Sequence, residues 1–175
     1  YPTVLVSSYL QVTLEDVDGN NQVGFGPTSI SSSRFATADE LGSGSATFAH
    51  TLQVSTNAAQ GYGVSILGQT PNINGIDFLA ALGGVPTTPV PGQSQFGLRG
   101  DIVTSSSGNA NVLSPYNSAG QYAYDAVSAP DQLFENVAGS GTDDTYSIDY
   151  VANIGYDTPP GEYSTNITYI VTGNF

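Results

Sequence analysis

The sequence predicts an all-β protein: an immunoglobulin-like β-sandwich with an N-terminal strand extension and at most one short helix. Apolar and polar residues alternate along roughly six to nine short segments, which is the period of a half-buried strand. Gly-, Pro- and Asn-containing turns separate these segments, and only one segment shows helical spacing. Short alternating strands divided by turns are typical of sandwiches, and a jelly roll is the nearest alternative.

The N-terminal 14 residues form one long predicted strand. Its aliphatic side chains at even positions share one face: Val4, Val6, Leu10, Val12 and Leu14. A Gly-, Ser- and Pro-containing stretch follows, and this composition favours turns and mobile backbone. We therefore divide the chain into an N-terminal strand with a flexible leash, residues 1–33, and a single-domain sandwich body, residues 34–175.

In the middle of the chain, residues 45–55 and 62–67 alternate on either side of an Asn-Ala-Ala-Gln-Gly turn and are expected to form a hairpin. Residues 76–82 carry the only helical spacing, with Ile76, Leu79 and Ala80 on one side, and are the one candidate helix.

The Pro-rich stretch 83–92 is expected to be a loop. A strand resumes over 95–104, and short strands are expected around 122–124 and 132–134.

The last third has the clearest pattern. Residues 145–154 and 162–172 both alternate, and Thr-Pro-Pro-Gly turns the chain between them. Two alternating segments joined by a Pro-Gly turn predict an antiparallel pair.

Composition and charge exclude several classes of partner. The chain has 175 residues, enough for one domain with its own core. Lys and Arg number 2 against 15 Asp and Glu, so the formal net charge is -13. A chain this acidic lacks the basic surface that nucleic acid or an anionic membrane requires. No apolar run approaches the about 20 residues of a membrane span.

The absence of certain residue types points to the cell exterior. The chain has no Cys, Met, Trp or Lys, and it is rich in Tyr, Ser, Thr, Asn and Gly. Such a chain resists oxidation and trypsin-like cleavage, which suits an extracellular, cell-surface location. Without Cys it can form no disulfide or thiolate metal site. No charged and then apolar leader opens the chain, so any signal peptide is expected to have been removed.

Several segments together carry a family resemblance. They are, in chain order, 46–62 (ATFAHTLQVSTNAAQGY), 95–98 (QFGL), 149–154 (DYVANI), 158–163 (TPPGEY) and 167–169 (ITY). In this order they resemble a poorly characterised family of secreted β-rich surface proteins from candidate-phyla bacteria, which are ultra-small and uncultivated. The resemblance covers most of the chain after about residue 34. It implies an extracellular β-sandwich and brings no catalytic residues.

No residue pattern predicts an enzyme. His50, the only histidine, lies mid-strand on an apolar face, where a neutral, hydrogen-bonded core histidine is expected. The Gly-Ser-Gly segments at 42–44 and 139–141 are expected to be turns, with no nucleophile elbow. No motif singles out a catalytic pair among the 15 carboxylates. We therefore predict no catalytic activity, no cofactor and no metal site.

Two acidic segments have alternative interpretations. Asp16, Asp18 and Asn20 place oxygen-bearing side chains at alternate positions, as calcium loops do at their start. The glycine comes early and no distal Glu follows, so an Asx-type turn is favoured, while calcium binding stays open. Asp143 and Asp144, beside a Gly-rich loop, have ion binding and the start of a strand in water as alternative interpretations, and a solvated turn is favoured.

The tyrosines divide into two groups. One group is expected in or near loops, where aromatic faces could bind glycans: Tyr116, Tyr122, Tyr124 and Tyr156. The other alternates along strands and is expected in the core or in cross-strand packing: Tyr146, Tyr150, Tyr163 and Tyr169. Asn166-Ile167-Thr168 matches a glycosylation acceptor, and its use stays open.

The N-terminal strand leads to the functional hypothesis. An apolar strand on a flexible leash can complete a neighbour's sheet, as in pilins, and a head-to-tail contact propagates as a fibre. We predict a structural subunit of an extracellular filament, whose partners are copies of itself and whose interface residues are the five aliphatic side chains of residues 1–14. Pairing of this strand within its own domain is the alternative for the strand. A monomeric glycan-binding or adhesin module is the alternative for the function.

Overall fold

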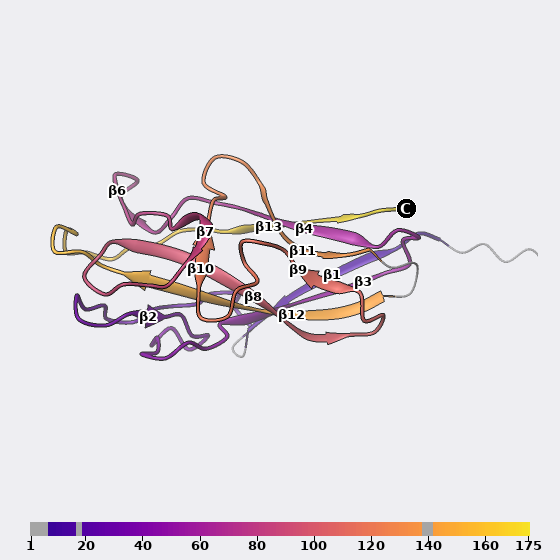
Figure 1. Cartoon of the computed structure of the whole chain (residues 1–175), viewed down its shortest axis with the longest axis horizontal. Helices are drawn as coiled ribbons and strands as arrows, with labels where there is room; N and C mark the ends of the chain where they lie inside the picture. The colour runs from indigo at the N-terminus through magenta and orange to yellow at the C-terminus, as the bar shows by residue number, and fades with distance from the viewer. Residues whose placement is uncertain (1–6, 17–18, 138–141) are drawn as a thin grey trace, which may run out of the picture.

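The computed structural model describes residues 7–16, 19–137 and 142–175. The described residues contain thirteen strands and no helix (Figure 1). The strands form two large antiparallel sheets, of seven and four strands, and one small two-stranded sheet. The prediction of an all-β, sandwich-like protein is therefore confirmed.

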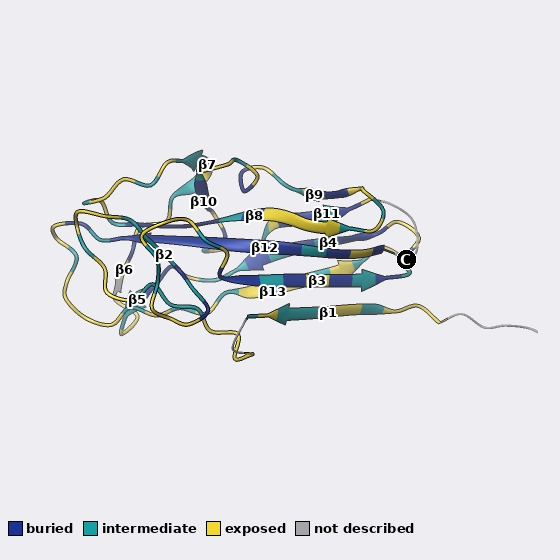
Figure 2. Ribbon diagram, turned by 90° about the horizontal axis from the view of Figure 1, so that it is seen from below, coloured by how far each residue is buried: buried dark blue, intermediate teal, exposed yellow. Residues whose placement is uncertain are grey.

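The first sheet has the strand order β1-β3-β12-β8-β10-β7, with β2 beside β12. Its strands are β1 Leu10–Glu15, β2 Arg34–Phe35, β3 His50–Thr56, β7 Gly83–Thr87, β8 Gln95–Ser105, β10 Tyr122–Tyr124 and β12 Thr142–Asn153. Strand β12, with 12 residues, lies in the middle of this sheet and has the longest run of buried residues in it (Figure 2).

The second sheet has the strand order β13-β4-β11-β9. Its strands are β4 Tyr62–Leu67, β9 Ala110–Val112, β11 Asp131–Asn136 and β13 Thr168–Gly173. The small hairpin consists of β5 Asn72–Ile73 and β6 Asp77–Phe78.

The core lies between the two large sheets. Inward-facing residues of the central strands β3, β4, β8, β11 and β12 are fully buried, among them Leu52, Val54, Val64, Ile66, Leu98, Phe134, Tyr146 and Ile148. The rings of Phe134 and Tyr146 stack across the core with their centroids 4.0 Å apart. The alternation seen in the sequence thus marks the inward face of each strand.

Both predicted strand pairings are wrong. Strands β3 and β4 do not form a hairpin: β3 pairs with β1 and β12, while β4 pairs with β13 and β11. Strands β12 and β13 likewise lie in different sheets. Each connection crosses from one sheet to the other, so the joined strands contribute their apolar faces to the core from opposite sheets instead of lying side by side in one sheet.

The helical spacing of residues 76–82 does not produce a helix. Asn74 and Gly75 have positive φ angles of 54° and 72° and belong to the three-residue loop between β5 and β6, where Asn and Gly are favoured. The side chain of Ile76 is 77% exposed, and of the three residues in the pattern only Leu79 is buried. The Asn-Gly turn therefore decides the local structure against the weak helical period.

The described part of the N-terminal strand lies along its own molecule. All residues of β1 pair with β3, from Leu10 opposite Thr56 to Glu15 opposite Thr51. An extension that leaves the body is therefore not confirmed. Val4 and Val6 lie outside the described residues.

Part of the predicted leash contacts the body. Gly24 and Phe25 form β-bridges with Thr37 and Leu41. The Arg34 guanidinium donates hydrogen bonds to the carbonyl oxygens of Phe25 and Leu41, at 3.0 and 2.8 Å. The division of the chain at residue 33 stays a prediction.

Candidate functional site

One long side of the sandwich is open, and it is bounded by β1 in the first sheet and β13 in the second. Figures 1 and 2 together show β13 facing β3, with β1 one strand further out. In the second sheet the described residues include no strand that faces β1. We call this region the open side; it contains the predicted interface residues Leu10, Val12 and Leu14.

The inward face of β1 is only partly covered. Val12 lies opposite Val54 of β3, yet Val12 is 42% exposed and Val54 is fully buried. Leu10 and Leu14 are half-buried and pack against the edge of the core. The three aliphatic side chains share a face, as predicted, and this face remains partly in contact with solvent.

The chain before β1 continues in line with the strand. The Tyr9 N–H donates to Asn57 Oδ1 at 2.8 Å, and the Asn57 Nδ2 amide donates to the Ser7 carbonyl at 2.8 Å. Asn57 lies in the turn that joins β3 and β4. These hydrogen bonds hold Ser7 and Tyr9 at the end of the sandwich where this turn lies.

The other boundary of the open side is the edge strand β13. Within the described residues it pairs with β4 on one side and with no strand on the other. Its six residues, Thr-Tyr-Ile-Val-Thr-Gly, include no charge and no proline, and their register with β4 is regular. A free, neutral and regular edge is a ready template for another strand.

The sheet edges away from the open side are protected. Strand β7 contains Pro86, and β9 is only three residues long. The far half of β8 shifts its register against β12, and Asp101 Oδ1 accepts a hydrogen bond from its neighbour Ile102 N–H. Proline, short length, irregular register and charge are the usual devices that prevent sheets from joining edge to edge.

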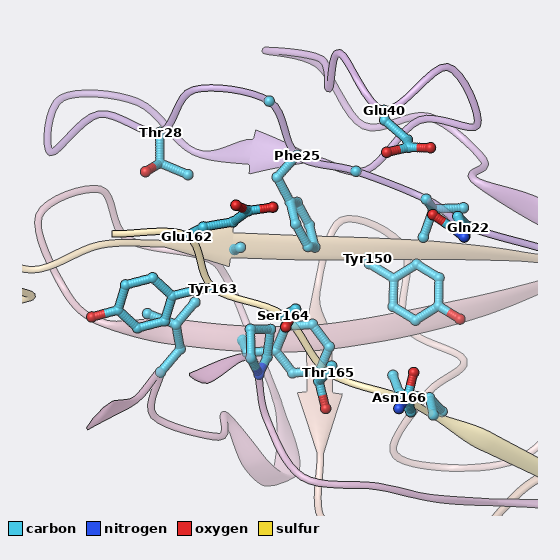
Figure 3. Close-up of a pocket in the computed structure, with 18 of the residues that line it drawn as sticks. Gln22, Phe25, Thr28, Glu40, Tyr150, Glu162, Tyr163, Ser164, Thr165 and Asn166 are labelled. Carbon is cyan, nitrogen blue, oxygen red and sulfur yellow. The ribbon is translucent and has the colours of Figure 1, made fainter. Parts of the chain in front are cut away.

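A cleft of about 940 Å³ opens at one end of the open side. Its walls come from residues 21–28, residues 161–169 and the inner face of the first sheet (Figure 3). Phe25 enters it from the first of these segments, and its ring meets that of Phe96 edge-on at 6.4 Å. Glu40 and Glu162 line it, and no described lining residue is a cation.

His50 lies on the inner wall of the cleft. Its Nε2 atom is 3.2 Å from the Tyr150 hydroxyl and 3.3 Å from the Tyr169 hydroxyl, and these hydroxyls also hydrogen-bond to each other. Burial lowers the pKa of His50 to about 4, against a small opposing effect of Asp16. His50 is thus a neutral, hydrogen-bonded histidine at pH 7, as predicted. The group joins three strands across the core and offers no catalytic triad.

A second polar group lies deep in the core. Asp144 has no exposed surface, and its Oδ2 atom accepts hydrogen bonds from the Tyr62 hydroxyl at 2.7 Å and the Asn136 amide at 2.6 Å. The expectation of a solvated turn is therefore wrong for Asp144. Its partners come from two other strands, β4 and β11, so the pattern within its own segment carried no sign of burial.

The opposite face of the first sheet carries one buried ion pair. The Arg99 Nη2 atom lies 2.7 Å from Asp149 Oδ2, and the Asp149 side chain is 1% exposed. Desolvation raises the pKa of Asp149, and Arg99 only partly offsets this effect. The pair lies beneath the sheet surface and holds two directly opposed residues of β8 and β12 together.

Three of the four tyrosines predicted for an exposed platform are buried. Tyr116, Tyr122 and Tyr124 are at most 1% exposed, and only Tyr156, at 85%, faces solvent. Hydrogen bonds accommodate two of the buried hydroxyls: Tyr116 donates to Asp131, and Tyr124 donates to the Gly68 carbonyl. Short strands and turns around them belong to the core and not to the surface. The predicted platform is therefore wrong.

The first acidic segment forms the expected turn. The Asn20 N–H donates to Asp16 Oδ1 at 3.1 Å, and the Gln22 N–H donates to Asn20 Oδ1 at 2.7 Å. Asp18 lies outside the described residues. No three His, Asp or Glu side chains of the described residues gather in a way that could hold a metal. Asn166 is exposed and lines the cleft.

The cleft and the free edge of β13 were not anticipated from the sequence. Most of the cleft comes from irregular segments, whose Gly- and Pro-rich composition shows only that they are loops. The free edge depends on which strands pair, and alternation does not report this.

We found no match for the chain, either to a protein-family model or to a curated protein sequence. In the part of the chain that the structure describes, no helix has the length and apolar character needed to cross a membrane.

Proposed function

We propose that this protein is a structural subunit of an extracellular filament, assembled when each copy donates its N-terminal strand to a neighbouring copy. Because Leu10–Glu15 pair with β3 of the same molecule, the donated part of the N-terminal strand is residues 1–6, with Val4 and Val6 on its aliphatic face. Its partners are copies of the same chain. The lysine-free and cysteine-free composition supports a location at the cell surface.

One observation carries this proposal: β1 is held at the edge of its sheet by a single ladder, and its apolar face is half covered. Val12, in the middle of β1, is 42% exposed. Addition of a strand to an exposed sheet edge is an established mode of recognition, in which main-chain hydrogen bonds give affinity and alternate side chains give specificity. A partner strand would cover the apolar face that the molecule alone leaves in water.

The burial of aliphatic side chains favours a long-lived contact between neighbouring copies. Each aliphatic side chain that moves from water into a core contributes about 1.5–3 kcal/mol. Val4 and Val6, together with the covering of Val12, therefore contribute several kcal/mol, from which the ordering of the donated segment is subtracted. Because donor and acceptor are different surfaces, the contact does not close on itself and extends into a fibre.

Negative-stain electron microscopy and analytical ultracentrifugation of the full chain test the proposal. We expect filaments from the full chain and monomers from a chain that lacks residues 1–6, with the same far-ultraviolet circular dichroism. Filaments from the truncated chain, or only monomers from the full chain at high concentration, would contradict strand donation.

A matched pair of variants tests which face of the segment is buried. Val4→Asp places a charge on the aliphatic face, and Thr3→Asp places the same charge one residue away on the opposite face. We expect Val4→Asp to lower the polymer fraction at least tenfold and Thr3→Asp to leave it close to that of the unmodified chain. Equal losses would contradict the assignment of the face.

The cleft supports a second candidate, a monomeric glycan-binding or adhesin module. Its aromatic side chains Phe25 and Tyr163 lie beside Asn166 and Glu162, and aromatic faces with amide and carboxylate groups suit neutral sugars. A glycan array with the monomeric chain tests this function. Binding that is lost in Phe25→Ala, together with an absence of filaments, would favour this alternative.

Two finer assignments belong to the same proposal. We propose that the sandwich is immunoglobulin-like, on the basis of its two antiparallel sheets and their crossing connections. The resemblance to secreted surface proteins of candidate-phyla bacteria is in keeping with the proposed location.

A further inference from the structure

We propose that the acceptor site is the space between the free edge of β13 and the uncovered face of β1, and that residues 1–6 of a second copy occupy it. We call this space the acceptor slot. The inference rests on the proposed function and adds the site, the segment and its direction. Residues 1–6 are the donated segment. Leu10, Val12 and Leu14 remain paired within their own molecule and form the floor of the slot.

The layout of the two sheets creates the slot. The first sheet extends one strand beyond the second, so β1 has no strand opposite it in the described residues (Figure 2). Paired sheets in sandwiches bury their inner faces by covering each other, and the position opposite β1 lacks such a cover. Val12 is 42% exposed although its neighbour Val54 is fully buried, because no strand of the second sheet covers Val12.

The chemistry of both walls fits an apolar, uncharged strand. The free edge of β13 offers unpaired backbone groups over six residues, and Tyr169 and Val171 point inward beside it. A donor of six residues spans about 20 Å, the length of β13 itself. Residues 1–6, Tyr-Pro-Thr-Val-Leu-Val, contain no charged side chain. An uncharged contact is what copies with a net charge of -13 require if they are to join.

The donor comes from a second copy because the molecule cannot fill its own slot. Asn57 holds Ser7 and Tyr9 in line with β1 at the end of the sandwich, so the six residues that precede Ser7 have to start from that end. A reversal into the same molecule would use at least two residues for the turn, and too few would remain to cover β13.

The strand directions agree with antiparallel pairing. Leu10 of β1 pairs with Thr56, and Gly173 of β13 pairs with Tyr62, so the start of β1 and the end of β13 lie at the same end of the sandwich. A copy shifted along the strand direction therefore presents its residues 1–6 to the next copy in the direction opposite to β13. There they run antiparallel to β13, as every neighbouring pair in the second sheet does.

Engineered disulfides test the slot directly because the chain has no cysteine of its own. Leu5→Cys, on the outward face of the donor, is combined in turn with Thr168→Cys, Ile170→Cys or Thr172→Cys, which are exposed on β13 and together sample the register. Directly opposed residues in neighbouring strands lie within disulfide reach. The matched control combines Leu5→Cys with Thr104→Cys on the protected edge of β8.

We expect a ladder of covalent multimers on non-reducing gels for at least one β13 position, at least tenfold stronger than for the β8 control, and its loss after reduction. Filaments by electron microscopy with no ladder at any β13 position would overturn the slot and leave the filament proposal intact. A full chain that forms no filaments would overturn both.

A second pair of variants tests the floor of the slot without engineered cysteines. Val12→Asp places a charge in the slot, and Thr13→Asp places it on the opposite face of β1. Because Val12 is already part-exposed in the single molecule, both variants are expected to fold. We expect Val12→Asp to lower the polymer fraction at least tenfold more than Thr13→Asp. Equal polymer fractions in two folded variants would overturn the slot.

Discussion

Protonation of His50 should destabilise the fold in a defined pH range. His50 is 7% exposed, and its pKa in the folded chain is about 4, against 6.5 for an unperturbed histidine. Between these values the unfolded chain binds a proton that the folded chain does not. The free energy of unfolding must therefore fall as the pH drops from about 6.5 towards 4.

The size of the effect follows from the two pKa values. One pKa unit corresponds to about 1.4 kcal/mol. The difference between 6.5 and about 4 then lowers the free energy of unfolding by about 3 kcal/mol when the effect is complete. Single domains are stable by only about 5–15 kcal/mol, so a loss of this size is readily measured.

Urea unfolding at pH 7, 6, 5 and 4, followed by circular dichroism, gives the free energy of unfolding at each pH. His50→Gln is the matched variant, because an amide can still hydrogen-bond to Tyr150 and Tyr169 but does not titrate. The raised pKa of Asp149 makes the free energy of unfolding rise as the pH falls, which opposes the effect of His50. This contribution is the same in the unmodified chain and in His50→Gln. We expect the unmodified chain to lose about 3 kcal/mol more than His50→Gln between pH 7 and the pKa of about 4. Parallel pH profiles for the two proteins would refute the reasoning.

Two further predictions concern the body of the sandwich. A Cβ on Gly100 would lie 2.3 Å from the Phe134 ring, so Gly100→Ala should cost about 1–3 kcal/mol in urea unfolding, whereas Gly63→Ala, with no atom within 4 Å, should be close to neutral. Equal effects of the two alanines would count against this packing. Arg99→Ala leaves the buried Asp149 carboxylate unpaired and should cost about 3–5 kcal/mol at pH 7 and less at pH 4.5. A loss that does not depend on pH would show that the charge of Asp149 is not the cause.

Much of the strand content could be predicted from alternation. Residues 62–67 and 122–124 coincide with β4 and β10, and Leu52 and Val54 are buried as expected. Alternation reports which face of a strand is apolar, because side chains point to opposite sides in turn. It does not report the partner strand. A five-residue turn such as 57–61 fits a hairpin and also fits a crossing between sheets, and tertiary packing decides between them.

The site could be predicted in part for the same reason. The shared face of Leu10, Val12 and Leu14 follows from sequence period alone. Their partial exposure does not, since it depends on how far the second sheet extends. The burial of Asp144 could not be predicted from its own segment either, because its hydrogen-bond donors, Tyr62 and Asn136, come from other strands of the fold.

The alignment of β1 with the long axis of the molecule has a mechanical consequence. Hydrogen bonds between antiparallel strands run perpendicular to the strands, and β1 forms such bonds with β3 along all six of its residues. A pull on the N-terminal end acts along β1, so the bonds are strained in shear and must yield together instead of opening one by one. Resistance to force is set by the rate of unfolding, and this geometry makes the same short strand the element that bears tension between one end of the molecule and the rest.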